Sequence, residues 1–343
     1  MPSRGITRLA ILLTGKRSRL MNVHEWPLTL FTILAQMSVG AFVTLGVVNV
    51  FGRTKYSTKT IDRLGNPALY AIGPIMVLAL IASIFHLGNP LNAPNAFRHV
   101  ASSWLSREIL FGVGFAALGF LFALAQWFNW FNATIRTVLA TITAVWGLVF
   151  VWVMAHVYLL PTVPAWNHWT TPASFYLSAG LTGSLAIAVA FSSWPTISNK
   201  WPKLDKSLNK TSSSNSAAKA REDVTTMRQT TELTNTVVKW VGITTVVLLT
   251  LQLAVTICAQ MIPATTNPPA TQFSTTWFIT RIVLLIIGAG LMGLYLTLSS
   301  QQNALTKKTR SLMTLAITSF ILVTASEIIA RFLFYGAMNR IGI

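Results

Sequence analysis

The sequence predicts an all-α polytopic membrane protein with eight transmembrane helices and both termini on the periplasmic side. Three observations support this fold class. The 343-residue chain is 53% hydrophobic and only 10% charged, whereas soluble domains usually carry about 25% charged residues. It contains eight apolar runs that can cross a bilayer core, which takes about 20 residues each. Its basic residues are concentrated in alternate segments between these runs.

Each predicted span is an apolar run, and several have a residue at one end that commonly starts or terminates a helix. Pro27 and Pro172 open two of them, since proline suits the first turn of a helix. Gly88 with Pro90 closes the second span, and Trp26 belongs to an aromatic belt at the membrane surface. The predicted spans are 28–51, 68–88, 109–126, 134–159, 172–195, 237–262, 276–299 and 312–335.

The distribution of Lys and Arg predicts the orientation. Eight spans place both termini on one side, so the connecting segments form two sets. One set holds fifteen basic residues and the set with the termini holds seven; Arg107, at the opening of the third span, and Lys239, Arg281 and Arg331, within spans, are in neither set. Cytoplasmic segments carry the excess of Lys and Arg. The fifteen-residue set, which comprises 52–67, 127–133 with the adjacent Arg136, 196–236 and 300–311, is therefore predicted to be cytoplasmic.

The predicted membrane domain covers residues 24–343, with a basic extension before it and one long polar segment within it. Residues 1–23 form a basic extension with an apolar run too short for a signal peptide or a span. Either translation of the natural protein starts at Met21, or the extension lies on a membrane surface. Residues 196–236, rich in Ser, Asn and Lys, are expected to form a flexible cytoplasmic loop.

The composition excludes several classes of function. A net charge of +18 is typical of proteins that bind nucleic acid, but here positive-inside topology accounts for it. The single cysteine, Cys258, excludes an internal disulfide and a thiolate-bound zinc or iron–sulfur centre within this chain. No metal site is expected, and any metal centre has to come from a partner.

The polar residues in and beside the spans are expected to collect at the outer leaflet. Burying a charge in a bilayer costs about 3 kcal/mol or more, so these few positions carry the best functional signal. Because the chain reverses direction at each span, the end of an even span and the start of an odd span face the same side. The candidates, with two neighbouring aromatic residues, are His24, Trp26, His86, Arg107, Glu108, His156, Arg281, Glu327, Arg331 and Tyr335.

His86 and Glu108 are the candidates for catalysis, because only the connection 89–103 separates their spans. A quinol oxidiser has to bind an aromatic headgroup, form hydrogen bonds to its two hydroxyls and release two protons. An imidazole accepts and passes on protons near neutral pH, and a carboxylate near water suits the exit step.

Structural roles are open for the same residues. His86 is as well suited to capping its helix, and Arg107 with Glu108 to forming an interfacial pair. Glu327 and Arg331, four residues apart, are expected to form an ion pair, with Arg281 as a neighbour. His156 is expected to be structural.

Several blocks in one order resemble the membrane-anchor subunit of the anaerobic dimethyl sulfoxide reductase family. They are HEWPL at 24–28, FTILAQMSVGAF at 31–42, FHLGNP at 85–90, SWLSREI at 103–109, TVPAWNHWTTPASF at 162–175, TRIVLL at 280–285 and SEIIARFLFYG at 326–336. The resemblance covers nearly every outer helix end. It leaves out residues 1–20 and most of 196–236.

The resemblance implies a subunit of a bacterial inner-membrane complex that oxidises menaquinol near the periplasmic face. Electrons then pass to a four-cluster iron–sulfur subunit and a molybdopterin catalytic subunit, and the anchor itself binds no haem. His86 and Glu108 match the histidine and glutamate implicated in the family's quinol site, whereas His156 stands where an arginine is expected. The alternatives are a related complex with another acceptor such as polysulfide or thiosulfate, a purely structural anchor and, least in keeping with these shallow charges, a transporter.

Overall fold

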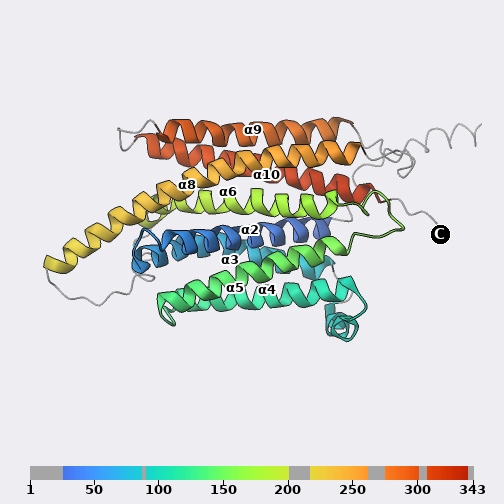
Figure 1. The fold of residues 1–343 in the computed structure, drawn as a ribbon, viewed down its shortest axis with the longest axis horizontal. Helices are drawn as coiled ribbons and strands as arrows, with labels where there is room; N and C mark the ends of the chain where they lie inside the picture. The colour runs from blue at the N-terminus through green and yellow to red at the C-terminus, as the bar shows by residue number, and fades with distance from the viewer. Residues whose placement is uncertain (1–25, 87–89, 201–216, 262–274, 301–306, 339–343) are drawn as a thin grey trace, which may run out of the picture.

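The computed structural model describes residues 26–86, 90–200, 217–261, 275–300 and 307–338. In these ranges all the regular structure is helical (Figure 1). The elements are α2 (Trp26–Gly52), α3 (Thr58–His86), the 3-10 helix η2 (Pro90–His99), α4 (Trp104–Trp127), α5 (Ala133–His156), α6 (Thr170–Lys200), α8 (Ala217–Gln260), α9 (Thr275–Ser300) and α10 (Lys307–Gly336). Eight of the helices contain a segment long and apolar enough to cross a membrane. The predicted all-helical fold with eight spans is confirmed.

The predicted helix starts lie within five residues of the observed ones, except at α3 and α8. Pro27 is the second residue of α2, and Pro172 is the third residue of α6. Helix α3 begins ten residues before the predicted span, where the Ser57 hydroxyl accepts a hydrogen bond from the Thr60 backbone amide at 3.3 Å. This bond satisfies an amide that has no partner within the first turn of the helix.

The expectation of a loop over residues 196–236 is wrong for most of that segment. Helix α6 continues to Lys200, and α8 begins at Ala217 and runs for 44 residues, about 66 Å at 1.5 Å per residue. Helix α8 contacts α3, where the Thr60 hydroxyl donates to Gln229 Oε1 at 3.0 Å, and Leu233 and Val237 of its early part are buried. An apolar stripe is present here, but the exposed polar face obscures it in the sequence. Residues 201–216 lie outside the described ranges.

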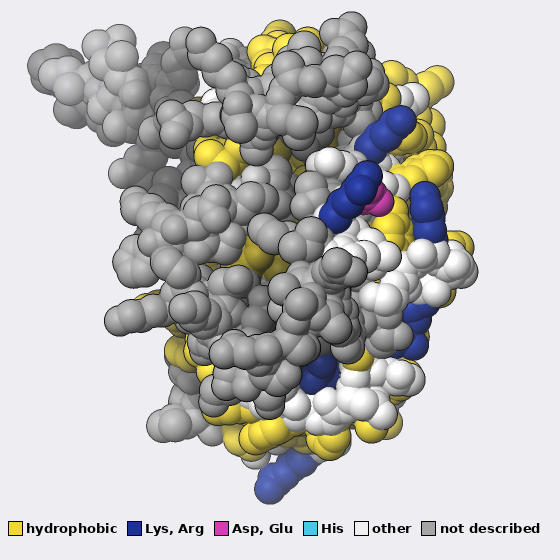
Figure 2. Space-filling model, turned by 90° about the vertical axis from the view of Figure 1, so that its left-hand side faces the viewer, with side chains coloured by type: hydrophobic (Ala, Val, Ile, Leu, Met, Phe, Trp, Pro, Cys, Tyr) yellow, Lys and Arg dark blue, Asp and Glu magenta, His cyan; other side chains and the backbone are white. Residues whose placement is uncertain are grey.

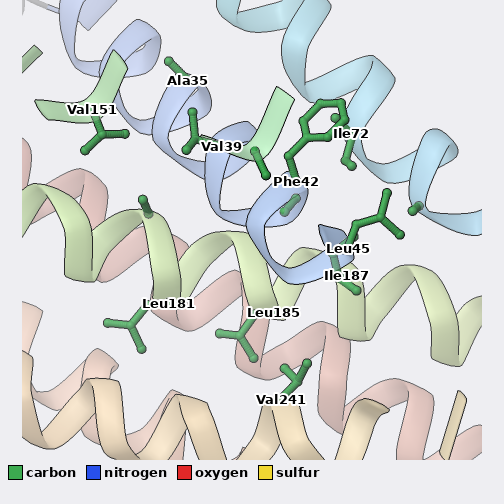
Figure 3. Packing of buried hydrophobic residues seen from close by; sticks show 14 of the residues in the cluster. Ala35, Val39, Phe42, Leu45, Ile72, Val151, Leu181, Leu185, Ile187 and Val241 are labelled. Atoms are coloured by element: carbon green, nitrogen blue, oxygen red, sulfur yellow. The ribbon is translucent and has the colours of Figure 1, made fainter. Parts of the chain in front are cut away.

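Helix α2 lies at the centre of the bundle. The spanning segment of α2 is 72% buried and that of α6 is 67% buried, against 28% for α3 and α4. Side chains of α2 pack against α3, α5, α6 and α10. Figure 3 shows Val39, Phe42 and Leu45 on α2 among Ile72 of α3 and Leu185 of α6.

Two glycines bring the backbones of α2 and α6 into contact. A Cβ atom at Gly40 would overlap the Ala179 carbonyl, and a Cβ atom at Gly183 would overlap the backbone of Gly40. Small residues at such crossings let helices approach closely, and van der Waals packing replaces the hydrophobic effect as the attractive force in a membrane.

The two ends of the bundle differ in character. Figure 2 views the end that contains the α2–α3 and α4–α5 turns, and it shows basic side chains over this surface. Arg53 and Lys55 lie in the α2–α3 turn, where Arg53 is half-buried and Lys55 exposed, and exposed Arg228 lies in the early part of α8. The opposite end carries the start of α2 and the end of α10, so both ends of the described bundle are on one side. Figure 1 shows the helices running antiparallel between these ends.

Candidate functional site

Glu108 lies in the second turn of α4 and points into the bundle. Its side chain is only 6% exposed, although its neighbours Trp104 and Leu105 are exposed. The helix begins where the Ser103 hydroxyl accepts a hydrogen bond from the Ser106 amide at 3.4 Å, and this cap sets the direction of the first turns. Among the residues that the structure describes, no side chain or backbone group forms a hydrogen bond or ion pair with the Glu108 carboxylate.

Arg107 points away from Glu108, so the predicted interfacial pair of these two residues is wrong. The guanidinium donates to the Val100 carbonyl at 2.8 Å and to the Ala101 carbonyl at 2.7 Å. It also lies 4.4 Å from the centroid of the Trp104 ring. Consecutive helix residues project about 100° apart, and the two nearby carbonyls satisfy the arginine without the carboxylate.

His156 belongs to the same outer cluster as Arg107. Its Nδ1 lies 2.8 Å from the Trp152 carbonyl, and its ring centroid is 4.1 Å from Trp152 and 4.6 Å from Trp104. The ring therefore links the ends of α4 and α5 on the surface of the bundle. This arrangement fits the structural role expected for His156.

Two tyrosine hydroxyls meet in the interior of the bundle. Tyr158 and Tyr335 are 7% and 3% exposed, and their hydroxyl oxygens lie 3.2 Å apart. The Tyr335 hydroxyl donates to Thr32 Oγ1 of α2 at 3.2 Å. The charge of Glu108 acts on both phenols, so the carboxyl and the two hydroxyls share one region of the bundle.

Aromatic rings enclose this pair of hydroxyls. The Tyr158 ring lies 5.4 Å from Trp166 and from Phe334, and 5.7 Å from Phe175, measured between centroids. Trp166 stacks on Phe334 and donates from Nε1 to the Phe334 carbonyl at 2.8 Å. Rings brought together from α6, α10 and the 157–169 connection thus form an apolar wall around a small polar centre.

Arg331 lies one turn deeper than Tyr335 and is 4% exposed. Its guanidinium donates to Gln36 Oε1 at 2.9 Å and lies 3.8 Å from the centroid of Phe175. Glu327 instead accepts a hydrogen bond from Gln252 Nε2 at 3.5 Å. The predicted ion pair between Glu327 and Arg331 is therefore wrong, because polar groups on α2 and α8 compete for the two side chains.

Arg281 completes this deeper group of charges. Its guanidinium donates to Thr256 Oγ1 at 3.5 Å, and its backbone carbonyl accepts from the Ser326 hydroxyl at 2.9 Å. The charges of Glu327 and Arg331 both act on it. The charge of Glu327 therefore acts on two arginines, Arg281 and Arg331, which supply compensating positive charge.

The remaining predicted site residues cannot be placed in this interior. Trp26 is 44% exposed, with its ring centroid 6.3 Å from Phe85. His24 lies outside the described residues, and so does the side chain of His86, whose backbone ends α3. The structure therefore brings together Glu108, Arg331 and Tyr335, and it leaves Arg107, His156 and Trp26 on the outside.

The family model for the DMSO reductase anchor subunit (DmsC) matches residues 21–337 of this chain. The chain belongs to this family.

Curated relatives agree with the family assignment of this DmsC-family subunit. It is 34% identical over 165 residues to an anaerobic dimethyl sulfoxide reductase chain of Escherichia coli (strain K12). The matched residues cover 47% of this chain and 56% of the relative. It is 34% identical over 170 residues to an anaerobic dimethyl sulfoxide reductase chain of Haemophilus influenzae, 49% of this chain and 60% of the relative. A sulfite dehydrogenase subunit of Allochromatium vinosum is 29% identical over 140 residues, 36% of this chain and 43% of the relative. The matches span little more than half the length of the dimethyl sulfoxide reductase relatives.

Family membership makes the DmsC-family protein a multi-pass membrane-anchor subunit of an oxidoreductase complex. Its described residues contain no group of three or more His, Cys, Asp or Glu side chains that could hold a metal ion. The interior site also includes residues that the sequence did not point to, namely Thr32, Gln36, Tyr158, Phe175 and Gln252. Gln36 and Gln252 carry a signal that could have been used, since each is a polar residue within an apolar span. Tyr158 has no such sequence signal, because only the packing of the folded chain brings it to its hydrogen-bond partner.

Proposed function

We propose that this subunit binds menaquinol at the interior site beside Glu108 and oxidises it, passing the electrons to an iron–sulfur subunit docked at the same end. The observation that supports the proposal best is the buried Glu108, which has no hydrogen-bond or ion-pair partner among the described residues and whose charge acts on two buried phenols. An unpaired buried carboxylate is costly, so this position suits a group that takes up and releases a proton.

The proposed reaction removes two electrons and two protons from each quinol. The quinol becomes a quinone, the electrons go to iron–sulfur clusters of the partner, and the protons go first to Glu108 and His86. His86 ends α3, and one short connection containing η2 separates it from α4. Both residues are at the end of the bundle opposite the basic surface of Figure 2.

The charge asymmetry supports the proposed orientation in a bacterial inner membrane. The end with Lys55, Arg53 and Arg228 is assigned to the cytoplasm, since cytoplasmic segments carry the excess of basic residues. The Glu108 end then faces the periplasm, together with both ends of the described bundle. The iron–sulfur subunit, and beyond it a molybdopterin catalytic subunit, are proposed to dock on that face.

The test uses the assembled complex with isosteric or size-matched variants. Glu108→Gln and His86→Phe are each expected to lower quinol-driven turnover at least about a hundredfold, the scale of general acid–base catalysis. Turnover with an artificial donor that reduces the clusters directly should stay unchanged, which shows that the complex is assembled.

The controls are substitutions of the same kind elsewhere in the chain. Glu232 is exposed and pairs with Arg228 at 3.4 Å, and His156 lies on the outer surface, so Glu232→Gln and His156→Phe should keep quinol-driven turnover. Full quinol-driven turnover in both Glu108→Gln and His86→Phe would overturn the proposal and leave a purely structural anchor.

A second candidate function has support from one comparison. Similarity to a sulfite dehydrogenase subunit is compatible with the reverse reaction, in which the partner's clusters reduce a quinone at this site. Reverse flow uses the same proton-carrying groups, and it predicts that the reduced complex converts menaquinone to menaquinol faster than the complex oxidises menaquinol.

A further inference from the structure

The hydroxyls of Thr32, Tyr335 and Tyr158 form a chain whose direction is fixed at one end. The Thr32 hydroxyl lies 3.0 Å from the Leu28 carbonyl and 3.0 Å from the Thr29 carbonyl of its own helix. A carbonyl oxygen only accepts hydrogen bonds, so the single hydroxyl proton of Thr32 is used there. Thr32 Oγ1 is then an acceptor for its other neighbour, the Tyr335 hydroxyl at 3.2 Å.

The same reasoning extends to Tyr158. Because the Tyr335 proton goes to Thr32, the Tyr335 oxygen accepts from the Tyr158 hydroxyl at 3.2 Å. Each hydroxyl has one proton and two acceptor positions. The proton of Tyr158 is therefore directed to Tyr335, and what Tyr158 offers to a further neighbour is an acceptor lone pair.

The phenol of Tyr158 keeps its proton in this environment. Burial raises the pKa of Tyr158 well above its ordinary value of 10.0, and the neighbouring Tyr335 and Glu108 raise it further while Arg331 opposes them. The ring is fixed by Trp166, Phe175 and Phe334. Tyr158 is thus a neutral, well-positioned hydrogen-bonding group rather than an acid or a base.

The reduced and oxidised forms of a quinone need opposite hydrogen-bonding partners. A hydroquinone carries hydroxyl groups that donate hydrogen bonds, whereas a quinone carries carbonyl oxygens that only accept them. An acceptor aimed at the ligand favours the hydroquinone. A quinone can use Tyr158 only if the Tyr158 proton leaves Tyr335, and the bond between the two tyrosines is then lost.

We propose that Tyr158 is a positioning residue that selects the hydroquinone form of the ligand, and that Thr32 sets this preference through Tyr335. The inference rests on the proposed function, since it concerns the same site beside Glu108. It assigns a role to two residues in separate elements, α2 and the 157–169 connection, that are 126 positions apart in the sequence. The preference gives the site a direction: it holds the substrate of quinol oxidation more tightly than the product.

The test measures binding of both redox forms to the full-length protein in lipid nanodiscs under anaerobic conditions. The probes are 2-methyl-1,4-naphthoquinone and its chemically reduced hydroquinone, and the quantity of interest is the ratio of their dissociation constants. Thr32→Val keeps the shape of the side chain but removes the hydroxyl. Tyr335 is then free to donate to Tyr158, and Tyr158 is free to donate to a carbonyl.

The wild-type protein is expected to bind the hydroquinone more tightly than the quinone. In Thr32→Val the ratio should shift toward the quinone by about two- to tenfold, the effect of one hydrogen bond, and Thr32→Ser should restore it. In Tyr158→Phe the preference should disappear. Tyr176→Phe is the matched control, because its hydroxyl donates to the Leu148 carbonyl at 2.9 Å in a more exposed position; it should leave the ratio unchanged.

The outcomes separate this inference from the proposed function. If the wild-type protein binds both forms and Thr32→Val weakens both equally, or changes neither, the role of Thr32 and Tyr158 in selection is wrong while the quinol site stands. If the wild-type protein binds neither form, the proposed site itself is wrong, and this inference fails with it.

Discussion

The Arg331 guanidinium donates to Gln36 Oε1 at 2.9 Å, and this bond joins residues 295 positions apart. It connects α10, the last helix of the bundle, to α2 at its centre. Gln36 also donates from Nε2 to the Met154 sulfur at 3.5 Å, so a single amide links α10, α2 and α5. The polar contact holds together the helices that carry Thr32 and Tyr335.

Gln36→Leu is expected to destabilise the subunit by about 2 kcal/mol, because it removes the neutral acceptor of a buried charged donor. The unfolding midpoint of the purified protein in detergent, followed by circular dichroism, should fall by several degrees. Gln260→Leu is the control, since Gln260 is exposed at the end of α8. Equal midpoints for the two variants would show that the bond to Arg331 adds no stability.

Two glycine-to-alanine substitutions should act in opposite directions. Gly183→Ala places a methyl group against the backbone of Gly40, so α2 and α6 have to separate, at a cost of about 1–3 kcal/mol. Gly290→Ala meets nothing within 4 Å and gains about 1 kcal/mol of helix propensity. The unfolding midpoints of the two variants, compared with the wild type, check the prediction. A midpoint for Gly183→Ala at or above that of the wild type would contradict the close contact.

The proposed orientation can be tested with single cysteines in a Cys258→Ser background. Thr54 lies between α2 and α3, and exposed Asn167 lies in the 157–169 connection at the opposite end. In intact cells, a membrane-impermeant maleimide should label Asn167→Cys from outside and should label Thr54→Cys only after the membrane is opened. The reverse pattern would place the Glu108 end in the cytoplasm.

The raised pKa of Tyr158 predicts a pH dependence of stability with a definite sign. A group whose pKa is higher in the folded state holds its proton more tightly there, so its contribution is complete below pH 10 and is lost as the pH rises above that value. The unfolding midpoint should therefore fall more steeply above pH 10 in the wild type than in Tyr158→Phe.

The sequence predicted the eight spans because membrane crossing depends on one-dimensional length and apolarity. It also identified Glu108, Arg331 and Tyr335 as members of one end of the bundle. It failed where the partner of a side chain depends on packing. Glu327 and Arg331 have the spacing of an ion pair, yet Gln252 and Gln36 from other helices take their places as partners.

The helical start of α8 was missed for a related reason. Its buried positions, such as Leu233 and Val237, are separated by polar residues, several of which are exposed. Thr32 and Tyr158 were missed because neither residue type is unusual at its position. Only the fold brings their hydroxyls to the two sides of Tyr335.

The touching backbones at Gly40 and Gly183 have a mechanical consequence. Helices α2 and α6 can tilt only together, so a thicker or thinner bilayer has to be accommodated by the less buried helices around them. Thr32 of α2 and Phe175 of α6 are on this shared unit. The spacing across the interior cluster of hydroxyls and rings is thereby expected to stay constant when the lipid composition of the cell changes.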